Sequence, residues 1–138
     1  MSPRDTSTGQ VLEAMVVPAL IRGGYQVERQ VVIEDRPGGG THRVDAVASK
    51  DAHRFLVSLK WQQVSGTAEQ KVPFEVISLA HAVRSGKYER AYLVLGGNGW
   101  TLRDYFTSGE LQEYLKDTDC VRVVTLEDFV ALANEGGL

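Results

Sequence analysis

Two neighbouring stretches of the sequence carry the residue types best suited to chemistry. In residues 54–62, read with period two, Ser58, Lys60 and Gln62 fall on one side of an expected strand, and large apolar residues fall on the other. Asp45 lies in a preceding strand of mostly small apolar residues. A charged side chain is rarely buried without a partner, so Asp45 must reach water or a cation. If the polar sides of the two strands coincide, a carboxylate and an ammonium group meet there, either as a salt bridge or as the lining of a reactive cleft.

The composition is that of one ordinary globular domain. The chain has 138 residues, 43% hydrophobic and 24% charged, so we expect a single domain over residues 1–138. The net charge of −3 excludes a histone-like coat of positive charge. The single cysteine, Cys120, cannot form an internal disulfide, and the sequence shows no signal-peptide pattern and no apolar run of bilayer length. We therefore expect a cytoplasmic protein that does not contact a membrane.

Hydrophobic periodicity predicts a helix and three strands in the first half of the chain. The helix is capped at Ser7 or Thr8, ends at Gly23-Gly24, and is expected to kink or loosen at Pro18. The strands cover residues 25–34, 41–49 and 54–62, with a glycine-rich turn at residues 35–40. Because both connections are short, the three strands should form an antiparallel meander.

The second half of the sequence alternates helices with strands. Thr67 and Gln70 fit a capping box for a helix that carries Pro73 in its first turn and ends near residues 85–86. An unbroken apolar run at residues 91–95 predicts an interior strand covered on both faces. A short helix near residues 110–115, a strand at 121–124 and a terminal helix at 126–133, capped by Thr125 with Asp128, follow. The fold class is α/β.

This order of elements, together with the candidate residues, resembles the PD-(D/E)XK nuclease superfamily over about residues 9–95. The resemblance implies a single domain with a restriction-endonuclease-like αβββαβ core, a mixed central sheet and helices on both faces. The hallmark of the superfamily is an acid on the second strand and (D/E)-x-K on the third, often with Gln two residues later. Asp45 matches the first acid, Lys60 the lysine and Gln62 the glutamine. Glu13 matches an acid that many members carry on the first helix.

Two positions depart from this hallmark. Val44 replaces the proline before the first acid, a variation that the superfamily tolerates. Ser58 stands where the hallmark has its second acid, and a neutral hydroxyl is a weaker ligand for a hard cation than a carboxylate. Glu69 and Glu75, in the segment after the strand, are the compensating candidates, and Glu13 is a third.

The resemblance implies phosphodiester hydrolysis that depends on a metal ion. Asp45, with Glu13 or a displaced acid, would hold Mg²⁺, for which Mn²⁺ can substitute, and the backbone carbonyl of Leu59 would assist. Lys60 would orient the attacking water and offset the developing charge. Gln62 would donate to phosphate or orient a ligand.

Three positive charges near the expected site are candidates for contact with DNA. Arg36 lies in the glycine-rich turn and Arg43 follows it; the turn is not a phosphate loop because no Gly-Lys-Ser/Thr follows it. Lys71 lies at the start of the second helix. A phosphate contact and a solvated surface charge remain alternatives for each.

These observations favour a small Mg²⁺-dependent DNA endonuclease of restriction-like or repair/recombination type. A chain this short leaves little room for a separate recognition domain, so we expect a homodimer on duplex or branched DNA. One alternative is a catalytically decayed nuclease fold that binds nucleic acid or serves as a partner subunit, which Ser58 and the acidic pI favour. Another is an enzyme of the same architecture that acts on RNA. The other matching residues are all present together, which favours catalysis.

Overall fold

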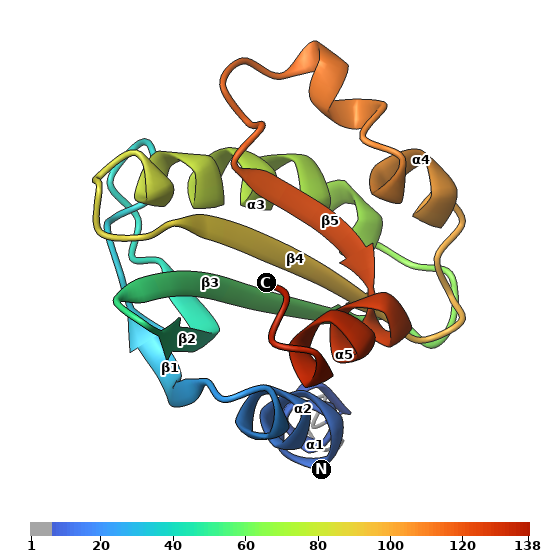
Figure 1. Cartoon of the computed structure of the whole chain (residues 1–138). Coiled ribbons are helices and arrows are strands. Elements are labelled where there is room, and N and C mark those ends of the chain that lie inside the picture. The colour runs from blue at the N-terminus through green and yellow to red at the C-terminus, as the bar shows by residue number, and fades with distance from the viewer. Residues whose placement is uncertain (1–6) are drawn as a thin grey trace, which may run out of the picture.

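A five-stranded mixed sheet forms the centre of the protein in the computed structural model, which describes residues 7–138 (Figure 1). Its strands lie in sequence order: β1 (Gln26–Val32), β2 (Arg43–Lys50), β3 (His53–Trp61), β4 (Arg90–Gly96) and β5 (Val121–Thr125). The first three strands are antiparallel, and β3, β4 and β5 run parallel. The predicted meander and the mixed sheet are therefore confirmed.

Helices cover both faces of this sheet, as predicted. One face carries α1 (Ser7–Val11), the π-helical turn η1 (Leu12–Val16), α2 (Val17–Arg22) and α5 (Leu126–Asn134), and the other carries α3 (Ala68–Val83) (Figure 1). The short helix α4 (Arg103–Thr107) and the 3₁₀ helix η2 (Leu111–Tyr114) connect β4 to β5. Within residues 7–138, no helix has the length and apolarity to cross a membrane.

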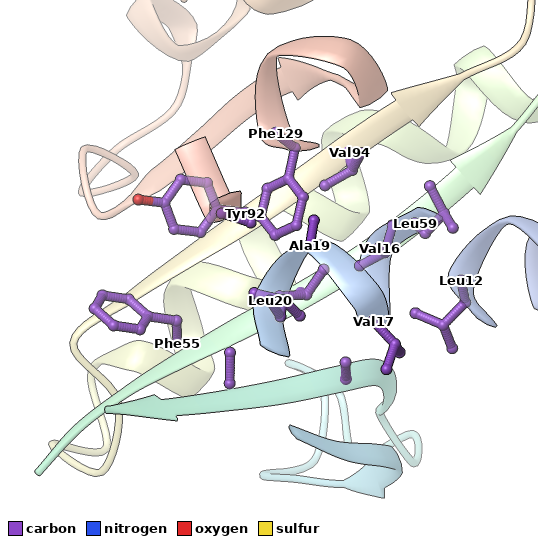
Figure 2. Close-up of a cluster of buried hydrophobic side chains, with 14 of the residues drawn as sticks. Leu12, Val16, Val17, Ala19, Leu20, Phe55, Leu59, Tyr92, Val94 and Phe129 are labelled. Atoms are coloured by element: carbon purple, nitrogen blue, oxygen red, sulfur yellow. The ribbon is translucent and has the colours of Figure 1, made fainter. Parts of the chain in front are cut away.

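An apolar core fixes the orientation of β3, the strand that carries Ser58 and Lys60. On the side of α2 and α5, the buried ring of Tyr92 meets Phe129 edge-on, with ring centroids 5.5 Å apart, and Leu59 of β3 packs in the same cluster (Figure 2). On the opposite side, Leu56 of β3 packs under α3. The period-two reading of β3 is thus confirmed, and it turns Ser58 and Lys60 toward α3.

The first helix is interrupted where Pro18 predicts it. Residues Leu12–Val16 form a π-helical turn, and Pro18 lies in the first turn of α2 that follows. Proline has no N–H for the carbonyl of the preceding turn, so a local widening of the helix is a natural adjustment. Gly24, with φ of 92°, ends the helix as expected. Thr8 lies inside α1 rather than at its cap, and the side chain of Ser7 is outside the described part of the chain.

The start of α3 differs from the sequence prediction. The Thr67 side chain makes no capping hydrogen bond, so the predicted capping box is wrong. The N–H of Ala68 instead donates to the side-chain oxygen of Gln62, at 3.1 Å, because the end of β3 lies beside the first turn of α3. Pro73 lies in the interior of α3 and not in its first turn.

The segment between β4 and β5 also departs from expectation. The residues expected to form an α-helix at 110–115 form the 3₁₀ helix η2, and α4 was not predicted. Short helices of about one turn gain little from propensity, so tertiary packing decides them. The expected cap of α5 is confirmed, since the N–H of Asp128 donates to the Thr125 hydroxyl at 3.1 Å.

Candidate functional site

The strands β2 and β3 separate beside Asp45. Their paired residues end at Ala46 and Val57, and beyond that point the N–H of Leu59 donates to the Asp45 carboxylate at 2.6 Å. This side-chain bond replaces the ladder bond that continued pairing would provide. The N–H and C=O of one strand residue point to the same side, so the Leu59 carbonyl also faces the gap between the two strands.

A backbone distortion in β1 lies opposite Asp45. Gln30 has φ of 53°, and the pairing of β1 with β2 omits Gln30 and Asp45 while continuing on both sides of them. A left-handed residue other than glycine is uncommon and costs free energy. A side-chain hydrogen bond from Gln30 acts on the Asp45 carboxylate and lowers its pKa. The distorted segment of β1 therefore contributes a hydrogen bond that favours the ionised form of Asp45.

The carboxylate of Glu75, on α3, lies beside Ser58, the residue that stands where the hallmark has its second acid. Its carboxylate accepts hydrogen bonds from the Ser58 hydroxyl at 2.8 Å, from His42 Nε2 at 3.0 Å and from Arg36 at 2.8 Å. Burial acts to raise the pKa of Glu75, but the hydrogen bonds from His42 and Arg36 and the nearby charge of Lys60 lower it to about 2. Glu75 is therefore ionised at neutral pH although its side chain is only 4% exposed.

The pKa of Asp45 is shifted in the opposite direction to that of Glu75. Burial raises its pKa, and the negative charge of Glu75 adds to the rise. The Leu59 N–H, the Lys60 ammonium and the Gln30 side chain act in the other direction without cancelling the rise. The site thus holds two interacting carboxylates, and burial together with the charge of Glu75 disfavours ionisation of Asp45; a cation bound at this carboxylate would oppose that effect.

Lys60 connects two adjoining pockets. The Asp45 pocket has a volume of about 350 Å³, and its lining includes Thr8, Arg43, Asp45, Ser58, Lys60 and Lys71. The Glu75 pocket, of about 280 Å³, is lined by Arg36, Lys60, Gln70, Lys71, Phe74 and Glu75. Lys60 forms no ion pair within 4 Å with an acid of residues 7–138, so the structure does not support the salt bridge considered for Asp45 and Lys60. A wider hollow of about 480 Å³ beside β5 contains none of the predicted site residues.

Gln62 lies at the end of β3 outside both pockets. Its side-chain amide donates to the Gly99 carbonyl at 2.9 Å and to Glu69 at 3.3 Å, and its oxygen accepts from Ala68. The loop after β4 packs directly on its backbone, where a Cβ at Gly97 would lie 2.4 Å from the Gln62 carbonyl oxygen. The hydrogen bonds of Gln62 thus join the end of β3 to α3 and to the loop after β4.

Glu13 and Glu69 are also kept apart from Asp45. Glu13 pairs with Arg29 at 2.6 Å on the surface, and both side chains are about half exposed. Glu69 accepts two backbone N–H groups of the loop before α4, at 2.7 and 3.0 Å. Neither acid lines the Asp45 or the Glu75 pocket, and α1 contributes Thr8 to the Asp45 pocket instead.

The three candidate DNA contacts lie around the two pockets. Arg43 and Lys71 are exposed and line the Asp45 pocket. Arg36 lines the Glu75 pocket, where it pairs with Glu75 and lies 5.8 Å from the centre of the Phe74 ring. The structure therefore brings together positive charges from the β1–β2 loop, β2 and α3.

The oxygen donors of the site fit a divalent cation with few protein ligands. Within residues 7–138, no group of three or more His, Cys, Asp or Glu side chains is arranged to hold a metal ion. The carboxylates of Asp45 and Glu75 and the carbonyl of Leu59 remain, and Mg²⁺ commonly uses one or two carboxylates together with substrate phosphate and water. The pKa of Asp45, which burial raises, is one that a cation bound at this carboxylate would lower.

Sequence reasoning missed three residues of the site: Thr8, Gln30 and His42. Buried His42 comes from the end of the β1–β2 loop, and its partner Glu75 is 33 residues away in the sequence. The distortion at Gln30 occurs without a glycine, so the sequence offers no signal for it. Thr8 could have been found, because it precedes buried Leu12 by one helical turn and shares its face of the helix.

The chain resembles known proteins in structure and matches one family model. No curated protein sequence matches the chain. Among solved structures, a protein of unknown function designated AF1548 aligns with 13% identity and a TM-score of 0.51 over 80% of this chain and 54% of its own. The small subunit of the heterodimeric restriction endonuclease R.BspD6I aligns with 13% identity and a TM-score of 0.46, over 83% of this chain and 61% of that subunit. SfsA of Pyrococcus furiosus, solved in complex with Ca²⁺, gives 16% identity and a TM-score of 0.42, with 84% and 52% covered.

These structural likenesses concern the fold alone, and the chain spans between about half and three fifths of the length of the three proteins. The match to a protein-family model is more direct evidence of the family to which the chain belongs. The family model described as a PD-(D/E)XK nuclease superfamily domain matches residues 4–136, nearly the whole chain. The match includes Asp45, Lys60 and Glu75 together with all five strands. The chain belongs to the PD-(D/E)XK nuclease superfamily.

Proposed function

We propose that this protein is a metal-dependent endonuclease that hydrolyses phosphodiester bonds in DNA. The observation that carries the proposal is the meeting of Asp45, Glu75 and Lys60 where β2 and β3 separate. Lys60 lacks an acidic partner within 4 Å among residues 7–138, which leaves its ammonium group available to a ligand. Membership of the nuclease superfamily supports the same chemistry.

Asp45, Glu75 and the Leu59 carbonyl would hold the metal ion, with Mg²⁺ as the physiological ion and Mn²⁺ as a substitute. A bound divalent cation would polarise the phosphate and stabilise the negative charge that develops on it. Arg36 and His42 keep Glu75 ionised and fixed in direction. Glu75 thereby takes the part of the second acid of the hallmark, which is Ser58 in this chain.

Lys60 would act on the reacting phosphate and on the attacking water. Its ammonium group lines both pockets and is close enough to both acids to affect their pKa values. A fixed positive charge in a partly buried site stabilises developing negative charge more than the same charge in water does. Arg43 and Lys71, exposed around the Asp45 pocket, would contact the flanking phosphates.

The test is cleavage of supercoiled plasmid and of branched DNA by the purified protein with Mg²⁺, with Mn²⁺ and with EDTA. We expect metal-dependent nicking or linearisation that is lost in Asp45→Ala and reduced roughly 100- to 1,000-fold in Lys60→Ala. Asp104→Ala and Lys116→Ala, at exposed positions outside both pockets, are the matched controls and should cleave normally. Equal rates in all four variants would refute the proposal.

A homodimer would let one site per chain act on each strand of a duplex. Light scattering of the protein alone and with DNA measures this directly. On DNA, the mass of the complex should exceed that of the DNA alone by twice the 15.2 kDa chain mass. A strictly monomeric complex would limit the enzyme to one strand at a time.

A second candidate function is a catalytically decayed module that binds nucleic acid. The specific observation in its favour is that every oxygen of Glu75 already accepts a hydrogen bond, from Arg36, His42 or Ser58. A metal ion would have to share these oxygens with their present donors. Retained DNA binding in a gel shift, with no cleavage of any substrate in either metal, would favour this module over the nuclease.

A further inference from the structure

The Glu75 pocket has a chemical character that phosphodiester hydrolysis alone does not require. Phe74, next to Glu75 on α3, is 48% exposed although it is a large aromatic residue. The pocket that it lines also contains the guanidinium of Arg36, 5.8 Å from its ring centre, and the amide of Gln70. An aromatic ring, a planar cation and an amide are the groups on which proteins stack and read nucleobases.

The position of this pocket relative to the reacting phosphate supports the same interpretation. Lys60 and Lys71 line both the Glu75 pocket and the adjoining Asp45 pocket. A phosphate held by these two lysines would therefore have Asp45 in the pocket on one side, and Glu75 and the Phe74 ring in the pocket on the other. The volume of about 280 Å³ greatly exceeds the roughly 30 Å³ that one water molecule occupies, so a planar base has room there.

We infer that the Glu75 pocket is a subsite for one unpaired nucleobase, which stacks on Phe74 while its own phosphate lies between Lys60 and Lys71. This inference rests on the proposed function and specifies its substrate as DNA with an unpaired or single-stranded nucleotide beside the scissile bond. A base inside an intact duplex would first have to leave its stack, which costs free energy. Branched, gapped or flapped DNA supplies such a base without that cost.

The experiment measures the affinity of the full chain for fluorescent DNA probes in Ca²⁺ by anisotropy. The probes are a paired duplex, the same duplex with one unpaired nucleotide, and the latter with that nucleotide made abasic. The wild type should bind the unpaired probe at least tenfold more tightly than the other two. Phe74→Ala should lose roughly 5- to 100-fold on the unpaired probe and little on the paired duplex.

Two further variants distinguish a loss of base stacking from a general loss of folding or of DNA binding. Phe74→Trp keeps an aromatic face and should retain the preference for the unpaired probe. Tyr114→Ala removes another exposed aromatic residue, 81% exposed and outside the pocket, and should bind as the wild type does. With 2-aminopurine at the unpaired position, the emission should fall on binding to the wild type and not on binding to Phe74→Ala. Equal affinity for all probes, no binding by the wild type, or Phe74→Ala binding within twofold of the wild type would each overturn the inference.

Failure of the inference differs from failure of the proposed function. If Asp45→Ala and Lys60→Ala lose cleavage but binding is indifferent to Phe74, the nuclease stands and the subsite is wrong. If binding of the unpaired probe depends on Phe74 while no metal supports cleavage, the subsite stands and the protein is a binding module.

Discussion

The Ser58 hydroxyl of β3 and the Glu75 carboxylate of α3 are joined by a 2.8 Å hydrogen bond, and both side chains are buried. The acid that the hallmark places on the strand therefore approaches the same point from the helix that crosses this face of the sheet. An acid buried in this way needs donors to stay ionised, and Arg36 and His42 supply them from the β1–β2 loop. The proposed relocation of the second acid thus involves three segments of the chain: β3, α3 and the β1–β2 loop.

Glu75→Gln tests this relocation. The substitution removes the charge and nearly keeps the shape, and we expect metal-dependent cleavage to fall by at least 10- to 100-fold, the loss typical of removing even an outer partner of a metal site. The double variant Ser58→Asp/Glu75→Ser returns the acid to the strand and should recover part of the activity. Plasmid nicking rates at equal Mg²⁺ measure both effects, and melting curves verify folding. A Glu75→Gln protein with the wild-type rate would remove Glu75 from the mechanism.

Asp45→Asn should make the metal-free protein more stable. The pKa of Asp45 is raised in the folded state, so its ionised form opposes folding at pH values above that pKa, and the asparagine removes this cost. The amide oxygen can still accept the hydrogen bond from the Leu59 N–H.

Melting curves in EDTA at pH 7 measure the effect. We expect a higher Tm for Asp45→Asn than for the wild type. Mg²⁺ should raise the Tm of the wild type and not that of Asp45→Asn. Asp104→Asn, at an exposed position, is the control and should melt as the wild type does. A variant that melts below the wild type in EDTA would contradict the electrostatic account.

Glu75 should dominate the loss of stability in acid. Its pKa of about 2 in the folded state is below the usual 4.5, so its ionisation stabilises the fold above pH 4.5 and this contribution disappears as the pH falls toward 2. The shift corresponds to a free energy of unfolding on the order of 3 kcal/mol. Tm measured from pH 7 to pH 2 should therefore fall less steeply for Glu75→Gln than for the wild type, with convergence at low pH. Parallel curves would show that the hydrogen bonds of Glu75 do not depend on its charge.

Much of the fold could be predicted because it rests on local patterns. The alternation of apolar residues in β3, the apolar run of β4 and the Thr125–Asp128 cap each involve residues that are close together in the sequence, and all are confirmed. The start of α3 could not be predicted, because the partner of Ala68 is Gln62, at the end of another element. Local signals at Thr67 and Gln70 were overridden by this tertiary contact.

The candidate site also combines features that the sequence could predict with features that it could not. Asp45 and Lys60 come together as their strand positions predict, since adjacent strands of a meander fix which residues are neighbours. The choice among three acids could not be made from sequence, because it depends on how α3 crosses the sheet. Only Glu75, among the three, is near enough to Ser58 to accept its hydrogen bond. Its donors His42 and Arg36 come from a loop whose conformation has no sequence period.

Gln62→Ala and Glu69→Ala distinguish a structural role from the catalytic role suggested by the hallmark. Gln62→Ala leaves the Ala68 N–H and the Gly99 carbonyl without their partner, and Glu69→Ala does the same to two N–H groups before α4. An unsatisfied buried group costs about 1–3 kcal/mol, and the partners of Gln62 are partly buried, so we expect a clearly lower Tm for Gln62→Ala. The two N–H groups that Glu69 accepts are exposed and can bond to water, so Glu69→Ala should lower the Tm less.

Because both side chains lie outside the two pockets, cleavage per folded molecule should change less than tenfold at a temperature well below the Tm. Leu102→Ala, which keeps its backbone N–H bond to Glu69, serves as the control for the loop. The opposite result, an unchanged Tm with cleavage lost in Gln62→Ala, would mean that Gln62 leaves its present partners to bind phosphate when DNA is present. That outcome would restore the glutamine of the hallmark to the reacting centre and would require the loop after β4 to move with it.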